Sequence, residues 1–91
     1  MLVTLEELKG YLRIDSDDDD ELLDSLLSSA EKTCADILRL PEGTQLEDTA
    51  NMKVAVLYCA AYLYEHREEA DHNRMNLTLR ALLFGDRSDV F

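Results

Sequence analysis

The chain has 91 residues, which suits a single domain, and its apolar share of 46% excludes a wholly disordered polypeptide. Twenty acidic residues against nine basic ones give a net charge of −11, which excludes a protein that clamps duplex DNA by neutralising its phosphates. One Pro and three Gly leave long uninterrupted stretches that favour helices. We expect one all-α domain over residues 1–91, a small bundle of about four helices.

The first expected helix, about residues 4–12, begins at a capping box. Thr4 stands at the N-cap and Glu7 follows three residues later, so each side chain can bond the backbone N–H of the other residue. The buried side of this helix is marked by leucines at helical spacing, Leu5, Leu8 and Leu12.

The second expected helix, about residues 18–40, follows an acidic run. Carboxylates are favourable at a helix N-terminus, but one or two satisfy that need. The surplus is a candidate acidic channel or surface patch, made of Asp17, Asp18, Asp19, Asp20 and Glu21. The helix itself carries one apolar stripe, formed by Leu22, Leu23, Leu26, Leu27, Ala30, Cys34 and Ile37. Pro41 and Gly43 end it.

The third expected helix, about residues 48–67, is apolar nearly all round. One side carries Met52, Val56, Cys59 and Leu63, and the opposite side carries Val54, Leu57, Ala61 and Tyr64. A helix of this kind needs neighbours on both sides, and a small chain has few elements to supply them. Asn51, Lys53 and Glu65 interrupt the apolar run, so we expect no membrane span.

The second side of this helix and its aromatic end form a candidate subunit interface. Its members are Val54, Leu57, Tyr58, Ala61, Tyr64, Glu65 and Arg67. Two interpretations of the tyrosines stay open. A tyrosine at the margin of a core buries its ring and keeps its hydroxyl in water. Tyrosine and arginine are also favoured anchors of protein interfaces.

The remainder of the chain predicts a loop and one short helix. Residues 68–74 are polar and are typical of an exposed loop. The last helix, about residues 77–84, presents Leu79, Leu82 and Leu83 on one side, and Gly85 is expected as its C′ residue. The expected bundle therefore has two long helices and two short ones, with no strands.

Nothing in the sequence predicts a metal site, a cofactor or catalysis. Asp15, Asp17 and Asp19 have the spacing of the first ligands of an EF-hand loop. However, Asp20 stands where that loop needs Gly, and Leu26 stands where it needs a bidentate Glu. No phosphate-binding Gly-rich loop and no nucleophile with a partner base is recognisable, so we do not expect an enzyme.

The cysteines and histidines have simple interpretations. Cys34 and Cys59 fall among apolar residues of helical segments, and no secretory leader precedes them. We expect two buried, reduced thiols. His66 and His72 lack the additional ligands that a zinc site needs.

Several segments resemble one family in the order in which they occur. Residues 5–15 (LEELKGYLRID) and 17–23 (DDDDELL) are similar to the opening of bacteriophage head–tail connector proteins, the small head-completion adaptors also described as DNA-packaging proteins. Residues 55–68 (AVLYCAAYLYEHRE) resemble the long middle helix of that family, and residues 79–87 (LRALLFGDR) resemble its closing element. The loop over residues 69–75 has no counterpart in this resemblance.

The resemblance implies an all-α structural subunit that assembles head-to-tail into a ring beneath the portal. Such a subunit would contact the portal protein and a tail or stopper protein, and double-stranded DNA would pass through the ring without specific binding. It would be made in the host cytoplasm and end in the virion, at the head–tail junction. The net charge of −11 suits a channel that DNA slides through.

One alternative function follows from the same charge. A small acidic regulatory module of phage origin can mimic DNA and occupy the nucleic-acid site of another protein. Such a mimic needs carboxylates spaced like phosphates along one face, whereas the densest acids here cluster at one helix start.

Overall fold

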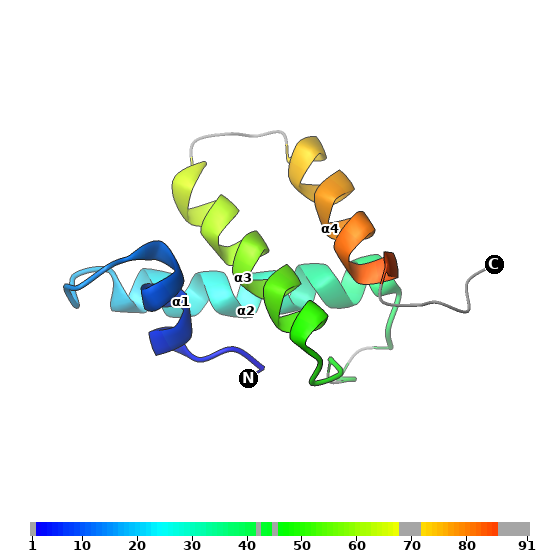
Figure 1. Cartoon of the computed structure of the whole chain (residues 1–91), viewed down its shortest axis with the longest axis horizontal. Helices are drawn as coiled ribbons and strands as arrows, with labels where there is room; N and C mark the ends of the chain where they lie inside the picture. The colour runs from blue at the N-terminus through cyan, green and yellow to red at the C-terminus, as the bar shows by residue number, and fades with distance from the viewer. Residues whose placement is uncertain (1, 42, 45, 68–71, 86–91) are drawn as a thin grey trace.

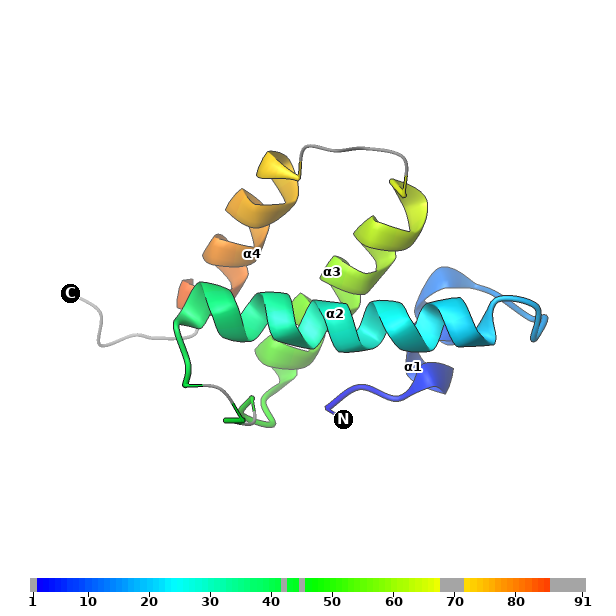
Figure 2. The same ribbon diagram turned by 180° about the vertical axis from the view of Figure 1, so that it is seen from behind.

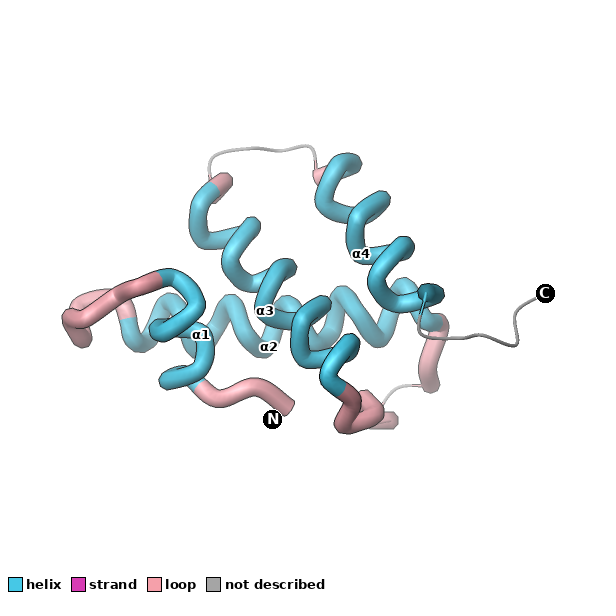
Figure 3. The backbone as a smooth tube through the Cα atoms, viewed as in Figure 1, coloured by secondary structure: helices cyan, strands magenta, loops and turns pink. Residues whose placement is uncertain are grey.

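Four α-helices make up the regular secondary structure of the described chain (Figure 1; Figure 3). The computed structural model describes residues 2–41, 43–44, 46–67 and 72–85. The helices are α1 (Leu5–Leu12), α2 (Asp20–Leu38), α3 (Ala50–Glu65) and α4 (Asn73–Gly85). The described residues contain no strand, and the expected all-α bundle is confirmed.

The helices form two layers. Helix α2 crosses behind the other three in Figure 1 and in front of them in Figure 2, where the molecule is seen from behind. Helices α1, α3 and α4 therefore lie on the same side of α2, with α3 between α1 and α4. Helix α3 packs against each of the other three. The third helix thus has neighbours on three sides within one chain.

Local sequence signals define most helix ends. The Thr4 side chain accepts a hydrogen bond from the Glu7 amide, and the Glu7 carboxylate accepts one from the Thr4 amide, which completes the predicted capping box. Thr49 caps α3 by accepting a hydrogen bond from the Met52 amide at 3.1 Å. Arg13 and Arg39 end α1 and α2 in the left-handed conformation, with φ angles of 60° and 59°.

The core lies between α2 and the three helices that cover it. Its fully covered members come from every helix and from the N-terminal segment, and they include Val3, Leu8, Leu23, Leu27, Ala30, Cys34, Ala55, Val56, Cys59, Ala60 and Leu79. Both cysteines are buried and free, as expected. Burial raises the pKa of the Cys34 thiol to about 12 and that of the Cys59 thiol to about 11, because a low-dielectric core disfavours the thiolate.

Helix α4 is longer than the sequence predicted. It begins at Asn73 rather than near residue 77, and Gly85 is its last helical residue instead of its C′ residue. The reason is Met75, which is 3% exposed, and whose Sδ lies 3.8 Å from the Cys59 Sγ. Met75, Leu79 and Leu83 recur every four residues, so burying Met75 extends the helix by one turn through a polar stretch.

Two leucines of α4 provide a matched test of this packing. Leu79 is fully buried, whereas Leu77 is 67% exposed. We expect Leu79→Ala to lower the free energy of unfolding by about 2–5 kcal/mol, and Leu77→Ala to change it by less than about 0.5 kcal/mol. Urea unfolding followed by circular dichroism measures both. Equal losses for the two variants would contradict the orientation of α4.

Candidate assembly surfaces

Three large apolar side chains are exposed among the described residues: Tyr11 on α1, Val54 on α3 and Leu77 on α4. Their exposed fractions are 52%, 46% and 67%. Isolated exposed apolar residues are ordinary on a protein surface, so the neighbours of each residue decide whether it marks a contact site.

The residues of the predicted subunit interface lie along α3 and just beyond its end, and three of them pack against the core. Val54 is the most exposed apolar member, and Leu57, Tyr58 and Tyr64 are partly buried. Glu65 and Arg67 are exposed. Ala61 is only 5% exposed, so it offers little surface to a partner. Val54, Glu65 and Arg67 are therefore the most accessible members of the predicted interface, and Leu57, Tyr58 and Tyr64 are only partly accessible.

Contacts between α3 and α4 set the register of the pair. The Asn51 amide donates a hydrogen bond to the Leu82 carbonyl, and the Tyr62 ring meets the His72 ring edge-on at 6.1 Å. The helices run antiparallel, so these two contacts bring Val54 level with residues 79–80 and Tyr58 level with residues 75–76. The exposed side chains of the two helices thus lie at matching heights.

Helix α4 contributes a second exposed feature that the sequence analysis did not select. Arg74 and Arg80 flank Leu77 at a spacing of three residues on either side, and all three are exposed. Neither arginine forms an ion pair with another described residue. Helix α4 contains no acidic residue, although the chain carries a net charge of −11. In the sequence, the helical spacing of Arg74, Leu77 and Arg80, on the side of the helix opposite Met75 and Leu79, was the signal that could have indicated this exposed surface.

An aromatic cluster joins the end of α3 to the start of α4. The Tyr62 ring stacks on His66, with centroids 4.0 Å apart and planes 17° apart, and lies 6.1 Å from Tyr58. The His66 Nδ1 lies 3.0 Å from the Tyr62 carbonyl oxygen. The His72 Nδ1 is buried and has no hydrogen-bond partner among the described residues. Both histidines thus pack against Tyr62 at the junction of the two helices.

The acidic run is tied to the protein by Lys9. Its ammonium group lies 2.8 Å from Asp17 Oδ1 and 2.9 Å from Asp20 Oδ1, and the Lys9 side chain is only 15% exposed. Hydrogen bonds to the two carboxylates raise the pKa of Lys9 above its ordinary value. The bond from Lys9 also lowers the pKa of the Asp17 carboxyl, because it stabilises the charged form.

A third acid of this run is held by α3. The Tyr64 hydroxyl donates a hydrogen bond of 2.7 Å to Asp19 Oδ2, which raises the pKa of Tyr64. The Arg67 guanidinium lies over the same ring, 5.1 Å from its centroid. Asp19 occupies the N-cap of α2 but makes no capping hydrogen bond with its side chain. Within the described residues, the side chains of Asp17, Asp19 and Asp20 thus have partners, whereas those of Asp18 and Glu21 form no ion pair.

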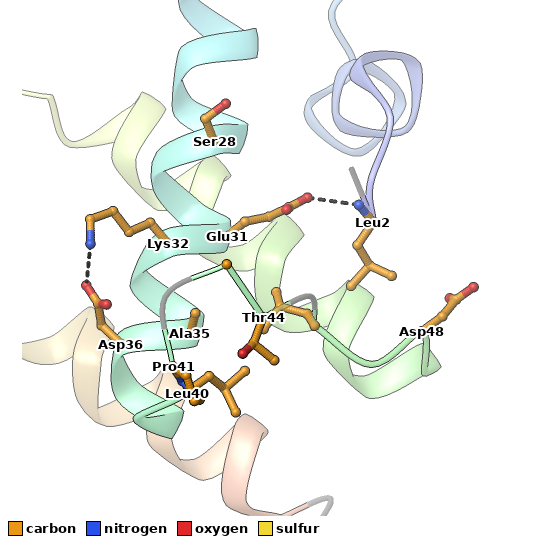
Figure 4. Close-up of a pocket in the computed structure, with 12 residues that line it drawn as sticks. Leu2, Ser28, Glu31, Lys32, Ala35, Asp36, Leu40, Pro41, Thr44 and Asp48 are labelled. Atoms are coloured by element: carbon orange, nitrogen blue, oxygen red, sulfur yellow. Dashed lines mark hydrogen bonds and ion pairs between the residues drawn. The ribbon is translucent and has the colours of Figure 1, made fainter.

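An open groove of about 810 Å³ lies between the N-terminal segment, α2 and the α2–α3 connection (Figure 4). The Leu2 amide donates a hydrogen bond of 2.9 Å to Glu31 Oε2 on one wall. Lys32 and Asp36, which lie on α2 like Glu31, pair at 3.3 Å. The lining mixes apolar side chains with these paired charges.

Two kinds of site have no candidate within the described ranges. No three His, Cys, Asp or Glu residues come together there in a way that could hold a metal ion. None of the described helices has the length and apolar character that a bilayer crossing requires.

The features above define a small all-α protein whose distinctive surfaces suit contacts with other proteins. The family of phage gp6-like head-tail connector proteins matches residues 2–81, and the chain belongs to this family. No curated protein and no solved structure matches the chain. The match extends from the N-terminal segment into α4, so it includes the exposed faces of α1, α3 and most of α4.

The family defines the chain as a structural phage protein rather than a member of a known enzyme class. Membership implies interaction with other head and tail proteins of the phage. It also implies a place at the head–tail junction of the virion. The resemblance carried by the helical segments is thereby confirmed.

The contacts of Lys9 yield a prediction about pH. Because Lys9 lowers the pKa of Asp17, the ionised carboxylate contributes stability above the ordinary aspartate pKa, and that contribution is lost as the pH falls through the lowered value. We expect Lys9→Met, which keeps an apolar stem, to raise the Asp17 pKa toward its ordinary value. NMR titration of the Asp17 carboxyl measures the change. Lys32→Met is the control, and an Asp17 pKa unchanged in both variants would contradict the bridge.

Proposed function

We propose that the protein is a ring-forming subunit of the head–tail junction, which helps to complete the DNA-filled head beneath the portal for tail attachment. The exposure of Val54 on α3 carries this proposal, because a connector must present contact surface beyond its own core. Val54 is 46% exposed on a helix that is otherwise packed on three sides. Family membership supports the structural role.

The proposed partners follow from the position of such a ring. Copies of the chain contact one another around the ring, the portal protein lies on one side, and a tail or stopper protein binds on the other. A head-to-tail contact uses two different surfaces on each subunit, and it closes into a ring when the rotation per subunit divides a full turn. We place Val54, Tyr58 and Glu65 in one of these contacts.

The charge of the chain supports passage of DNA without binding. A net charge of −11 repels phosphates, because nine Lys and Arg residues stand against twenty Asp and Glu residues. The alternative of a DNA mimic needs free carboxylates spaced along one face. Asp17 and Asp20 instead contact Lys9, and Asp19 contacts Tyr64. The arrangement of the acids therefore supports the connector over the mimic.

Two valines on α3 test the assembly face. Val54 is 46% exposed and Val56 is fully buried. We expect Val54→Asp to keep the helical circular dichroism of the wild type but to weaken assembly, since an unpaired charge at a contact costs about 3–5 kcal/mol. Val56→Asp places that charge in the core and should unfold the chain. Sedimentation and electron microscopy, with and without portal protein, measure assembly. A wild-type chain that stays monomeric even with portal protein would contradict the ring.

The acidic residues provide a separate test. We expect a map of the assembled ring to show part of the acidic run, including Glu21, facing the central channel. A ring in which every acid of the run points outward would refute the channel role, while the ring itself would stand.

A further inference from the structure

Helix α4 presents an exposed side that nothing in the described chain covers. Helix α4 packs on α2 and α3, so its outer side faces away from both (Figure 1). Leu77 on this side is the most exposed large apolar residue described, and Arg74 and Arg80 flank it without ion pairs to other described residues. With Val54 and Tyr58, which lie at matching heights on α3, these residues form what we name the α3–α4 outer surface.

The opposite kind of surface lies at the end of α1. Tyr11, in the last turn of α1, is 52% exposed. One exposed base, Arg13, follows at the end of α1, and residues 14–24 after it contain seven acids and no base. Asp15 and Asp18 are exposed and form no ion pair with another described residue. We name Tyr11, Asp15 and Asp18 the acidic end. Each surface thus has an exposed apolar side chain beside charges, and the two surfaces carry opposite signs.

The two surfaces lie far apart on the molecule. The longest dimension is 44 Å, and the α1–α2 connection stands at one end of it, whereas α4 lies toward the other end (Figures 1 and 2). A symmetric dimer pairs the same patch with itself, which would bring like charges together here. Two complementary patches at opposite ends favour a head-to-tail contact, in which each copy uses one patch toward each neighbour.

We propose that the α3–α4 outer surface of one copy docks on the acidic end of the next copy. Arg74 and Arg80 would bond carboxylates such as Asp15 and Asp18, and Arg–carboxylate bonds are strong and geometrically specific. Leu77 would be covered beside Tyr11, and Tyr and Arg are enriched at the centres of protein interfaces. The contact rests on the proposed function, because it presumes that copies of the chain form a ring. It adds which two surfaces of the chain meet.

Complementary charge reversals test this pairing. The variant Arg74→Glu/Arg80→Glu makes the α3–α4 outer surface acidic, and the variant Asp15→Arg/Asp18→Arg makes the acidic end basic. Like charges then oppose each other in every contact within a population of either variant. We expect each variant alone to fold, by circular dichroism, and to need at least about tenfold higher concentration to assemble than the wild type.

Mixing the two variants supplies the decisive measurement. In an equimolar mixture every contact can pair opposite charges again, either in the native orientation or in the reversed one. We expect sedimentation to show assembly restored to within about threefold of the wild-type concentration dependence. Misfolded chains would not be rescued by mixing, so restoration separates a broken contact from a broken fold.

Lys32→Glu is the matched control, because it reverses one exposed charge on α2, outside both surfaces. It should assemble like the wild type, whereas Arg80→Glu alone should assemble less well. Variants that assemble as readily as the wild type, or a mixture that does not assemble, would overturn this pairing while the ring stands. A wild-type chain that forms no oligomer, even with portal protein, would overturn the ring and the pairing together.

Discussion

Burial of one side of α3 against α2 is the contact on which the rest of this structure depends. Met52, Val56 and Cys59 follow one another along that side and are covered by α2 and its neighbours. Helices α1 and α4 then pack on the flanks of α3. A chain of this length buries only a modest apolar area on folding. One central helix that packs against all the others increases that buried area. The remaining outer side of α3 is the part that we propose for contact with other proteins.

The acidic run shows how a charged segment can serve both the fold and the proposed assembly. Lys9 holds Asp17 and Asp20, and Tyr64 holds Asp19, so the segment before α2 is fastened to both α1 and α3. Exposed ion pairs add little stability individually, but they restrict where this segment can lie. Asp15 and Asp18 remain exposed beside it. A segment positioned in this way can present its free carboxylates to a neighbouring copy in a defined direction.

The α3–α4 junction fixes the second proposed surface. Tyr62 contacts both His66 and His72, and Met75 contacts Cys59 one turn further along α4. These contacts set how α4 is rotated about its axis, because Met75, Leu79 and Leu83 must all point inward. The rotation in turn leaves Leu77 outside. The exposure of one leucine is therefore a consequence of packing several residues away.

The sequence by itself determined the helices whose signals are local. The capping box at Thr4 and the apolar stripe of α2 each depend on residues within a few positions, so periodicity and capping rules sufficed to predict them. The buried side of α3 and the outer position of Val54 were predictable for the same reason. Tertiary structure decided the start of α4, because its polar first turn becomes helical when the Met75 side chain is buried in the core. It also decided the partners of the acids, since Tyr64 and Asp19 stand 45 residues apart and no local pattern links them.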